Sequence, residues 1–165
     1  MIEDLDYSVD SKLLLENQFG FALYAAANAI AKAFRNKLAP LGITYPQFLV
    51  LSVLWEQDGV KISDIGHRLR LDSGTLTPLI RRLERDGLVR RVRSVQDERV
   101  MQIFLSERGR DLKTDALEAR RKVGHYIKMS QYDIEEMRNL LLKLVDDFGH
   151  DDSLIASPGK SKTDR

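Results

Sequence analysis

The stretch Leu71–Glu84 reads LDSGTLTPLIRRLE and combines a helix start, an apolar face and a cationic face. Its apolar side chains recur with the i, i+3, i+4, i+7 spacing of one helix face, at Leu76, Leu79, Ile80 and Leu83. At about 100° per residue, the other side carries Gly74, Pro78, Arg81 and Arg85, with Thr77 and Arg82 beside them. Such a helix is either an ordinary amphipathic surface helix or one that offers Arg and Thr to the major groove of DNA.

The residues before this stretch predict a helix-turn-helix. A brief helix is expected to begin at a Ser63 cap, and a turn at Asp72-Ser73 leads into the second helix. Two starts of the second helix fit the sequence. It begins either at Ser73, which leaves Pro78 inside the helix without a backbone donor, or at Pro78 behind a Thr77 cap.

The residues after this stretch predict a wing. Gly87 ends the helix, and the Val- and Arg-rich segment 88–93 is expected to pair with segment 99–105 around a polar turn at 94–98. A two-stranded hairpin with a charged tip, directly behind a helix-turn-helix, favours the DNA-reading interpretation over the plain surface helix.

Four further helices are expected. The first begins near Lys12 and ends at the break 40–42, and capping-box spacing at Thr44–Gln47 opens a second that is apolar nearly all round. A third spans about 106–128 and the last spans 130–149. The last helix has an apolar seam, typical of a helix that packs against another, at Ile134, Met137, Leu141, Leu144 and Phe148.

Composition limits the class of protein. The 165 residues are 43% hydrophobic and 31% charged, and they include no Cys. A thiolate nucleophile, a disulfide and a Cys-based zinc or redox site are therefore excluded. Neither an apolar run of membrane-span length nor a basic signal sequence is present, so we expect a cytoplasmic location and no membrane partner. The three His residues are far apart and no catalytic motif stands out, so we expect no enzyme activity, metal or cofactor.

Charge is unevenly distributed along the chain. Residues 60–110 carry twelve basic and seven acidic side chains, a net charge of +5, whereas residues 1–59 and 111–152 each carry −3. A basic centre between acidic flanks indicates that the middle of the chain faces a polyanion.

The order of these elements, from about Leu13 to Phe148, resembles that of the MarR family of dimeric winged-helix transcription regulators. The strings that carry the resemblance are LENQ (15–18), FALY (21–24), LGITYPQF (41–48), LWEQDG (54–59), LDSGTLTPL (71–79) and DERV (97–100). Together they are similar to the organic-hydroperoxide repressor subgroup, OhrR. The resemblance implies a mainly α fold with a small β-hairpin wing: a winged helix-turn-helix with an N- and C-terminal helical dimerisation region.

The expected organisation has four parts. Residues 11–43 and 106–149 form the helical dimerisation region, and residues 44–105 form the winged helix-turn-helix DNA-binding region. Residues 1–10 are expected to be a mobile N-terminus, and residues 150–165 a disordered tail.

The sensing residue of the OhrR subgroup is absent. By resemblance, its members sense peroxide with a Cys in the context LENQxCFxLY, whereas this chain has Gly20 there. Tyr24 matches the first of two supporting tyrosines, but Phe34 replaces the second. We therefore expect a signal other than a thiol reaction. The residues expected to line the family's cleft around a small aromatic or apolar effector are Gly20, Tyr24, Phe34, Tyr45 and Trp55, with a plain core role as an equal alternative for Tyr24 and Trp55.

The resemblance also implies which residues read DNA. Arg99 at the wing tip is expected to enter the minor groove, with Asp97 orienting it through a charge-assisted bond. Arg91 and Arg93 are expected to meet phosphates, although a solvated strand face is a nearly equal interpretation for both. The residues expected at the major groove are Ser73, Thr75, Thr77, Pro78, Arg81 and Arg82.

These features predict a sequence-specific, homodimeric transcription regulator. The first helix and the last two are expected to pair across a two-fold axis, which places two recognition helices about 34–36 Å apart on a palindromic double-stranded DNA operator. We expect a repressor that a small molecule releases from DNA. Two alternatives stay open: a constitutive DNA binder without an effector, and a winged helix that binds another protein.

Overall fold

The computed structural model describes residue 11 and residues 13–149. These residues belong to two compact units, the first ending at Tyr126 and the second beginning at Ile127. The expected mobile N-terminus at 1–10 and the expected disordered tail at 150–165 lie outside the described residues.

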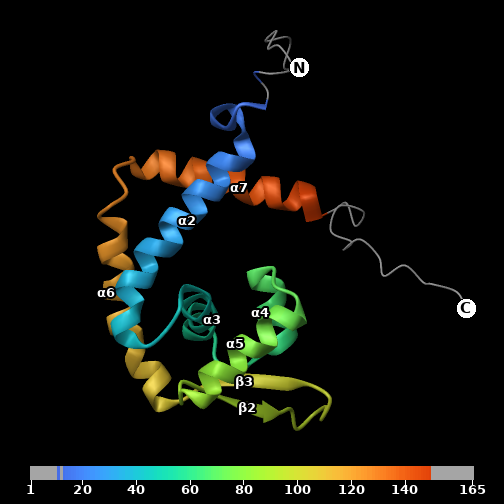
Figure 1. Cartoon of the computed structure of the whole chain (residues 1–165). Coiled ribbons are helices and arrows are strands. Elements are labelled where there is room, and N and C mark those ends of the chain that lie inside the picture. The colour runs from blue at the N-terminus through green and yellow to red at the C-terminus, as the bar shows by residue number, and fades with distance from the viewer. Residues whose placement is uncertain (1–10, 12, 150–165) are drawn as a thin grey trace, which may run out of the picture. The chain divides into compact units, whose positions relative to one another are not determined.

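The first unit is mainly helical and contains a small sheet (Figure 1). Its elements in chain order are η1 (Leu15–Asn17), α2 (Phe19–Leu38), η2 (Ala39–Leu41), α3 (Tyr45–Glu56), β1 (Val60–Lys61), α4 (Ile62–Leu69), α5 (Ser73–Arg85), β2 (Val89–Arg93), β3 (Met101–Leu105) and α6 (Glu107–Gly124). The described part of the second unit holds α7 (Gln131–Gly149). The predicted mainly α fold with a small β wing is confirmed.

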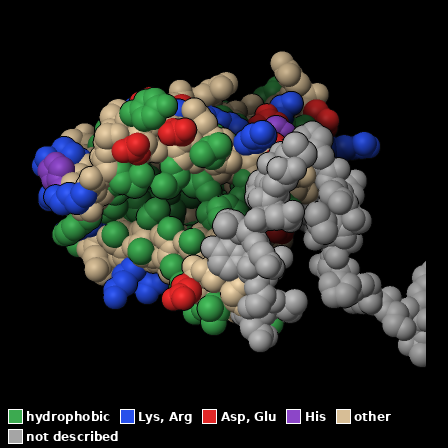
Figure 2. All heavy atoms as spheres, turned by 90° about the horizontal axis from the view of Figure 1, so that it is seen from above, with side chains coloured by type: hydrophobic (Ala, Val, Ile, Leu, Met, Phe, Trp, Pro, Cys, Tyr) green, Lys and Arg blue, Asp and Glu red, His purple; other side chains and the backbone are tan. Residues whose placement is uncertain are grey.

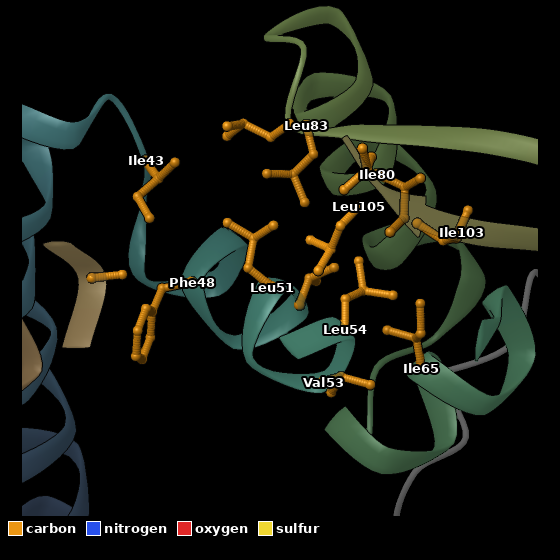
Figure 3. Close-up of a cluster of buried hydrophobic side chains, with 14 of the residues drawn as sticks. Ile43, Phe48, Leu51, Val53, Leu54, Ile65, Ile80, Leu83, Ile103 and Leu105 are labelled. Atoms are coloured by element: carbon orange, nitrogen blue, oxygen red, sulfur yellow. The ribbon is translucent and has the colours of Figure 1, made fainter. Parts of the chain in front are cut away.

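α3 lies in the centre of the first unit's core. Its Leu51 and Leu54 side chains are at most 1% exposed, which confirms that this helix is apolar nearly all round. It contacts both α4 and α5 of the helix-turn-helix. Burial of these apolar side chains is the main favourable contribution to folding. Figure 3 shows the cluster that they form with neighbouring elements, including Ile43, Phe48, Leu51, Leu54, Ile65, Ile80, Leu83, Ile103 and Leu105.

The wing belongs to a three-stranded antiparallel sheet with the strand order β1-β3-β2. The sequence predicted the hairpin of β2 and β3 but not the pairing of β1. Val60 of β1 lies opposite Ile103 of β3, and both side chains are buried. The pairing satisfies backbone groups that burial would otherwise leave without partners. It leaves β2 as an edge strand.

One helix start follows the predicted cap chemistry, and another lies at one of the two predicted positions. Thr44 Oγ1 accepts the Gln47 N–H at 3.4 Å and Gln47 Oε1 accepts the Thr44 N–H at 2.8 Å, which completes a capping box for α3. α5 begins at Ser73 behind an Asp72 N-cap, the first of the two predicted starts, so Pro78 lies inside the helix.

Two predicted helix starts are wrong. α2 begins at Phe19 rather than near Lys12, because Gln18 is extended, with φ −88° and ψ 113°, behind the 3₁₀ turn of η1. α4 begins directly after Lys61, and Ser63 is not its cap. The Ser63 hydroxyl bonds its neighbouring carboxylate instead.

The predicted end of the third long helix is also wrong. α6 ends at Gly124 rather than near Lys128. A tight turn follows, in which the Tyr126 N–H donates to the Val123 carbonyl at 3.0 Å. Glycine has a low helix propensity, which favours termination at this point.

Within the described ranges, no helix taken singly has the length and apolar character that crossing a bilayer requires. The helical segments Phe19–Leu41 and Tyr45–Glu56 meet that test only as a pair, bent by 73°.

Candidate nucleic-acid interface

α5 exposes a polar face opposite a buried apolar face. Its Leu76, Ile80 and Leu83 side chains are at most 1% exposed. Of the residues predicted to read DNA, Thr77 is half-buried and the others are exposed, namely Ser73, Thr75, Pro78, Arg81 and Arg82. The core leaves these side chains available to a partner, and their contact with DNA stays a prediction.

Asp72 fixes the first turn of α5. Its Oδ1 accepts the backbone N–H of Thr75 and its Oδ2 accepts the Thr75 hydroxyl, each at 2.9 Å. These bonds, the backbone one foremost, hold the pKa of the Asp72 carboxyl below its ordinary value. The Thr75 hydroxyl proton is thereby engaged, so its oxygen faces solvent as an acceptor. Sequence reasoning placed Asp72 in the turn but missed this role, although Asp is a typical N-cap residue.

At the wing tip, Asp97 shapes the backbone rather than the Arg99 side chain. Its Oδ1 accepts the backbone N–H of Arg99 at 2.9 Å, and its carbonyl accepts the Val100 N–H at 2.9 Å. The predicted bond from Asp97 to the Arg99 guanidinium is not formed, because the carboxylate turns back onto the main chain, as Asp commonly does in turns. Arg93 and Arg99 are exposed.

Arg91 has a partner within the protein. Its Nε donates to Glu84 Oε2 at 2.6 Å, and its backbone N–H donates to Glu84 Oε1 at 3.3 Å. Neither sequence-based interpretation of Arg91, a free phosphate contact or a solvated strand face, includes this ion pair. Sequence reasoning misses Glu84 because the pair joins two elements across the turn at Gly87.

The residues predicted to line an effector cleft do not share one cavity within the chain. Phe34 and Tyr45 stack with ring centroids 4.3 Å apart, and Phe48 packs against both. Gly20 lies near the other end of α2, about 20 Å from Phe34 at the helical rise per residue. Tyr24 is 67% exposed, and no described side chain lies within 4 Å of where a Gly20 Cβ would be. Within the single chain, Gly20 and Tyr24 therefore lie apart from the aromatic cluster at Tyr45, and their part in an effector site stays a prediction.

A cavity of about 650 Å³ lies between α2, the start of α3 and α5. Among the residues predicted to line the effector cleft, Tyr45 lines this cavity. Burial raises the pKa of the Tyr45 hydroxyl, and the positive charge of Arg120 offsets part of this effect, so the hydroxyl is neutral at physiological pH. Arg35 and Arg82 add two guanidinium groups to an otherwise mostly apolar lining, which includes Ala31, Pro46 and Leu79.

Trp55 lies at a separate hollow. This space has a volume of about 220 Å³ and is lined by residues of α3 and α6, including Lys113 and Arg120. The Trp55 indole N–H donates to the Gly109 carbonyl at 2.9 Å. Trp55 therefore joins α3 to α6 and lines a hollow other than the cavity beside Tyr45, which fits the core role held as its alternative.

The predicted dimerisation seam lies on α7. Its Met137 and Phe148 side chains are 48% and 54% exposed, and the other three seam residues are half-buried: Ile134, Leu141 and Leu144. Exposed apolar side chains on α7 extend beyond the seam to Tyr132, Leu140, Leu142 and Val145.

Comparison with known proteins places this site in a family. Residues 43–101 match the MarR family. The chain is 55% identical over 104 residues to the HTH-type transcriptional regulator TtmR of Methylorubrum extorquens, a match that covers 63% of this chain and about half, 53%, of that relative's length. It is 40% identical over 132 residues to the organic hydroperoxide resistance transcriptional regulator of Bacillus subtilis, covering 80% of this chain and 90% of that one.

Solved structures agree with the sequence relatives. Reduced AbfR bound to DNA, a protein known from Staphylococcus epidermidis, superposes with a TM-score of 0.72 at 32% identity, covering 85% of this chain and 96% of that one. The helix-turn-helix and wing described above are the elements that such regulators bring to DNA. The chain therefore belongs to the MarR family of winged-helix, DNA-binding transcription regulators, which are not enzymes.

Proposed function

We propose that the protein is a homodimeric repressor that reads a palindromic operator. The observation that carries the proposal is the exposed polar face of α5, with Arg81 and Arg82 beside hydroxyl groups, opposite a buried apolar face. A helix of this kind fits the major groove, and the wing behind it presents Arg99 to the neighbouring minor groove. The net charge of +5 over residues 60–110 supports contact with phosphates.

Exposed apolar surface supports the homodimer. On α2, the Phe19, Phe21 and Tyr24 side chains are 64%, 38% and 67% exposed. Figure 2 shows hydrophobic side chains gathered on one face of the molecule, with charged side chains near the margin. Large patches of this kind are typical of protein–protein interfaces. A second copy is the expected partner, because a two-fold dimer places two recognition helices one turn of DNA apart.

The DNA contact is tested with a fragment that the wild-type protein selects from a random-sequence library. Arg99→Ala should weaken binding to this fragment by roughly tenfold, since one minor-groove contact is lost. Fluorescence anisotropy measures the affinity, and light scattering should show that the mass in solution is unchanged. Arg138→Ala, on α7, is the charge-matched control. Equal affinity of Arg99→Ala and wild type contradicts the assignment of the wing.

We further propose that a small aromatic anion releases the protein from DNA by binding in the cavity beside α5. Arg82 lines this cavity and also lies on the exposed side of α5, so an anion that binds its guanidinium removes it from the DNA-reading face. Arg35 offers a second cationic contact, and Tyr45 offers a neutral hydroxyl. An apolar lining with a few convergent polar groups is typical of small-molecule sites.

Substituted benzoates at millimolar concentration test this proposal. They should raise the melting temperature and release the selected DNA fragment. Arg35→Ala should abolish both effects while DNA binding persists, because Arg35 lies on α2, outside the predicted DNA-reading set. Lys113→Ala, at the separate hollow beside Trp55, is the control and should respond like wild type. If no compound weakens DNA binding, the ligand proposal is contradicted and the constitutive binder takes its place.

A further inference from the structure

A carboxylate at the end of the recognition helix holds the base of the wing. Glu84 lies in the last turn of α5, and both of its oxygens accept bonds from Arg91 of β2. Oε2 takes the Arg91 Nε–H at 2.6 Å and Oε1 takes the Arg91 backbone N–H at 3.3 Å. One side chain of the helix therefore fixes both the backbone and a cationic side chain of the strand.

The backbone bond is available because β2 is an edge strand. In the order β1-β3-β2, one side of β2 faces no other strand within the described residues. The Ser94 N–H donates across the hairpin to the Val100 carbonyl at 2.9 Å. Since inward and outward N–H groups alternate along an antiparallel strand, the Arg91 N–H points away from β3. Glu84 binds this outer edge.

The pair lies far enough from the wing tip that a small rotation at the pair displaces the tip. Arg91 lies near the base of the hairpin, six residues before Asp97 in the tip turn. A fully extended chain would separate the two by about 20 Å at most, since β2 itself ends at Arg93. A rotation of the hairpin by about 10° at its base would therefore move the tip, and Arg99 with it, by up to roughly 3 Å, and a shift of even about 1 Å weakens a direct hydrogen bond.

We infer that Glu84 and Arg91 are positioning residues that set the angle between the recognition helix and the wing. The pair presents Arg99 and the polar face of α5 to DNA in one fixed arrangement, which lowers the cost of ordering the wing on binding. It also assigns the Arg91 side chain to the protein rather than to a phosphate. The inference rests on the proposed DNA-reading function.

Anisotropy titrations with the library-selected fragment separate this role from a phosphate contact. Arg91→Gln should weaken binding by about three- to tenfold, as expected when one partly exposed pair that preorganises a site is lost. In the Arg91→Gln background, the further loss of DNA affinity caused by Arg99→Ala should be smaller than in wild type, because a wing without the Glu84–Arg91 pair no longer holds Arg99 at the minor groove. In the Arg99→Ala background, adding Arg91→Gln should leave the slope of log affinity against log salt unchanged, because Arg91 itself touches no phosphate. Additive losses, with a slope that falls by about 0.9 more in that background, would show a phosphate contact of Arg91 and overturn the inference.

Arg93→Gln is the matched control. Arg93 lies two residues further along the same strand face, and no ion pair of its side chain is found in the part of the chain that the structure describes. Its loss should add to that of Arg99→Ala and should reduce the salt slope. Thermal melts establish that each variant is folded.

A charge reversal gives a second, independent test. Arg91→Glu alone should weaken binding strongly, and adding Glu84→Arg should restore most of the affinity, since the pair is remade with the same net charge. A reversed pair that binds as weakly as Arg91→Glu alone also overturns the inference. If Arg99→Ala by itself has no effect on DNA binding, the proposed contact of the wing with DNA is contradicted instead. The single substitution therefore tests the proposed function, and the reversed pair tests the positioning role.

Discussion

The Asp72 carboxylate binds the backbone and the hydroxyl of Thr75, and it accepts both bonds fully only while it is ionised. These bonds lower its pKa in the folded state. Its stabilisation of the fold is therefore present above the ordinary pKa of Asp, about 4, and is lost as the pH falls through the lowered folded-state value.

Asp72→Ala should accordingly lower the melting temperature at neutral pH, and its difference from wild type should shrink as the solution is acidified. Asp72→Asn is the matched control, because Asn also caps helices but does not ionise. It should keep much of the stability at neutral pH and show no such titration. A difference between wild type and Asp72→Ala that stays constant through acidification contradicts the role given to the ionised carboxylate.

At the scale of elements, the first turn of α6 is bonded to the DNA-binding region. The Ser106 hydroxyl donates to the Gly87 carbonyl at 2.6 Å, and Arg108 donates to the Asp86 carbonyl at 2.9 Å. The predicted boundary between residues 105 and 106 thus coincides with a junction that joins α6 firmly to the turn between α5 and β2. Movements of α6 are expected to reach the recognition helix through this junction.

A glycine makes the junction possible. A Cβ on Gly109 would lie 2.1 Å from the Leu88 carbonyl oxygen. Gly109→Ala should therefore lower the free energy of unfolding by about 1–3 kcal/mol, the usual cost of overpacking, as measured by urea denaturation. Gly124→Ala in the same helix is the control, since no described side chain lies within 4 Å of its Cβ position. Equal stabilities of the two variants would contradict the close approach of α6 to Leu88.

At the scale of the whole molecule, the proposed homodimer depends on the apolar seam of α7. Met137→Asp should shift the protein from dimer to monomer, because the new carboxylate would be buried without a partner in the interface. Light scattering at micromolar concentration measures the mass. Val95→Asp, at a wing-tip position that is 100% exposed, is the matched control and should leave the mass unchanged. A wild-type mass of one chain would contradict the homodimer itself.

Local pattern predicted the parts of this protein that depend on neighbours within a turn or two of helix. The buried face of α5, the Thr44–Gln47 capping box and the order of helix, turn and wing are of this kind, since periodicity and cap chemistry act over short sequence distances. The exclusion of thiol chemistry needed only the composition, because the chain has no Cys.

Three-dimensional packing settled the features that join distant segments. Val60 pairs with Ile103, Glu84 holds Arg91 but not Arg93, and the length of α2 separates Gly20 from the aromatic cluster. Two arginines on one face of β2 look alike in sequence, and only the carboxylate brought up by the neighbouring helix distinguishes them. Contacts between elements are fixed by the packing of the core, which a local pattern of residues does not specify.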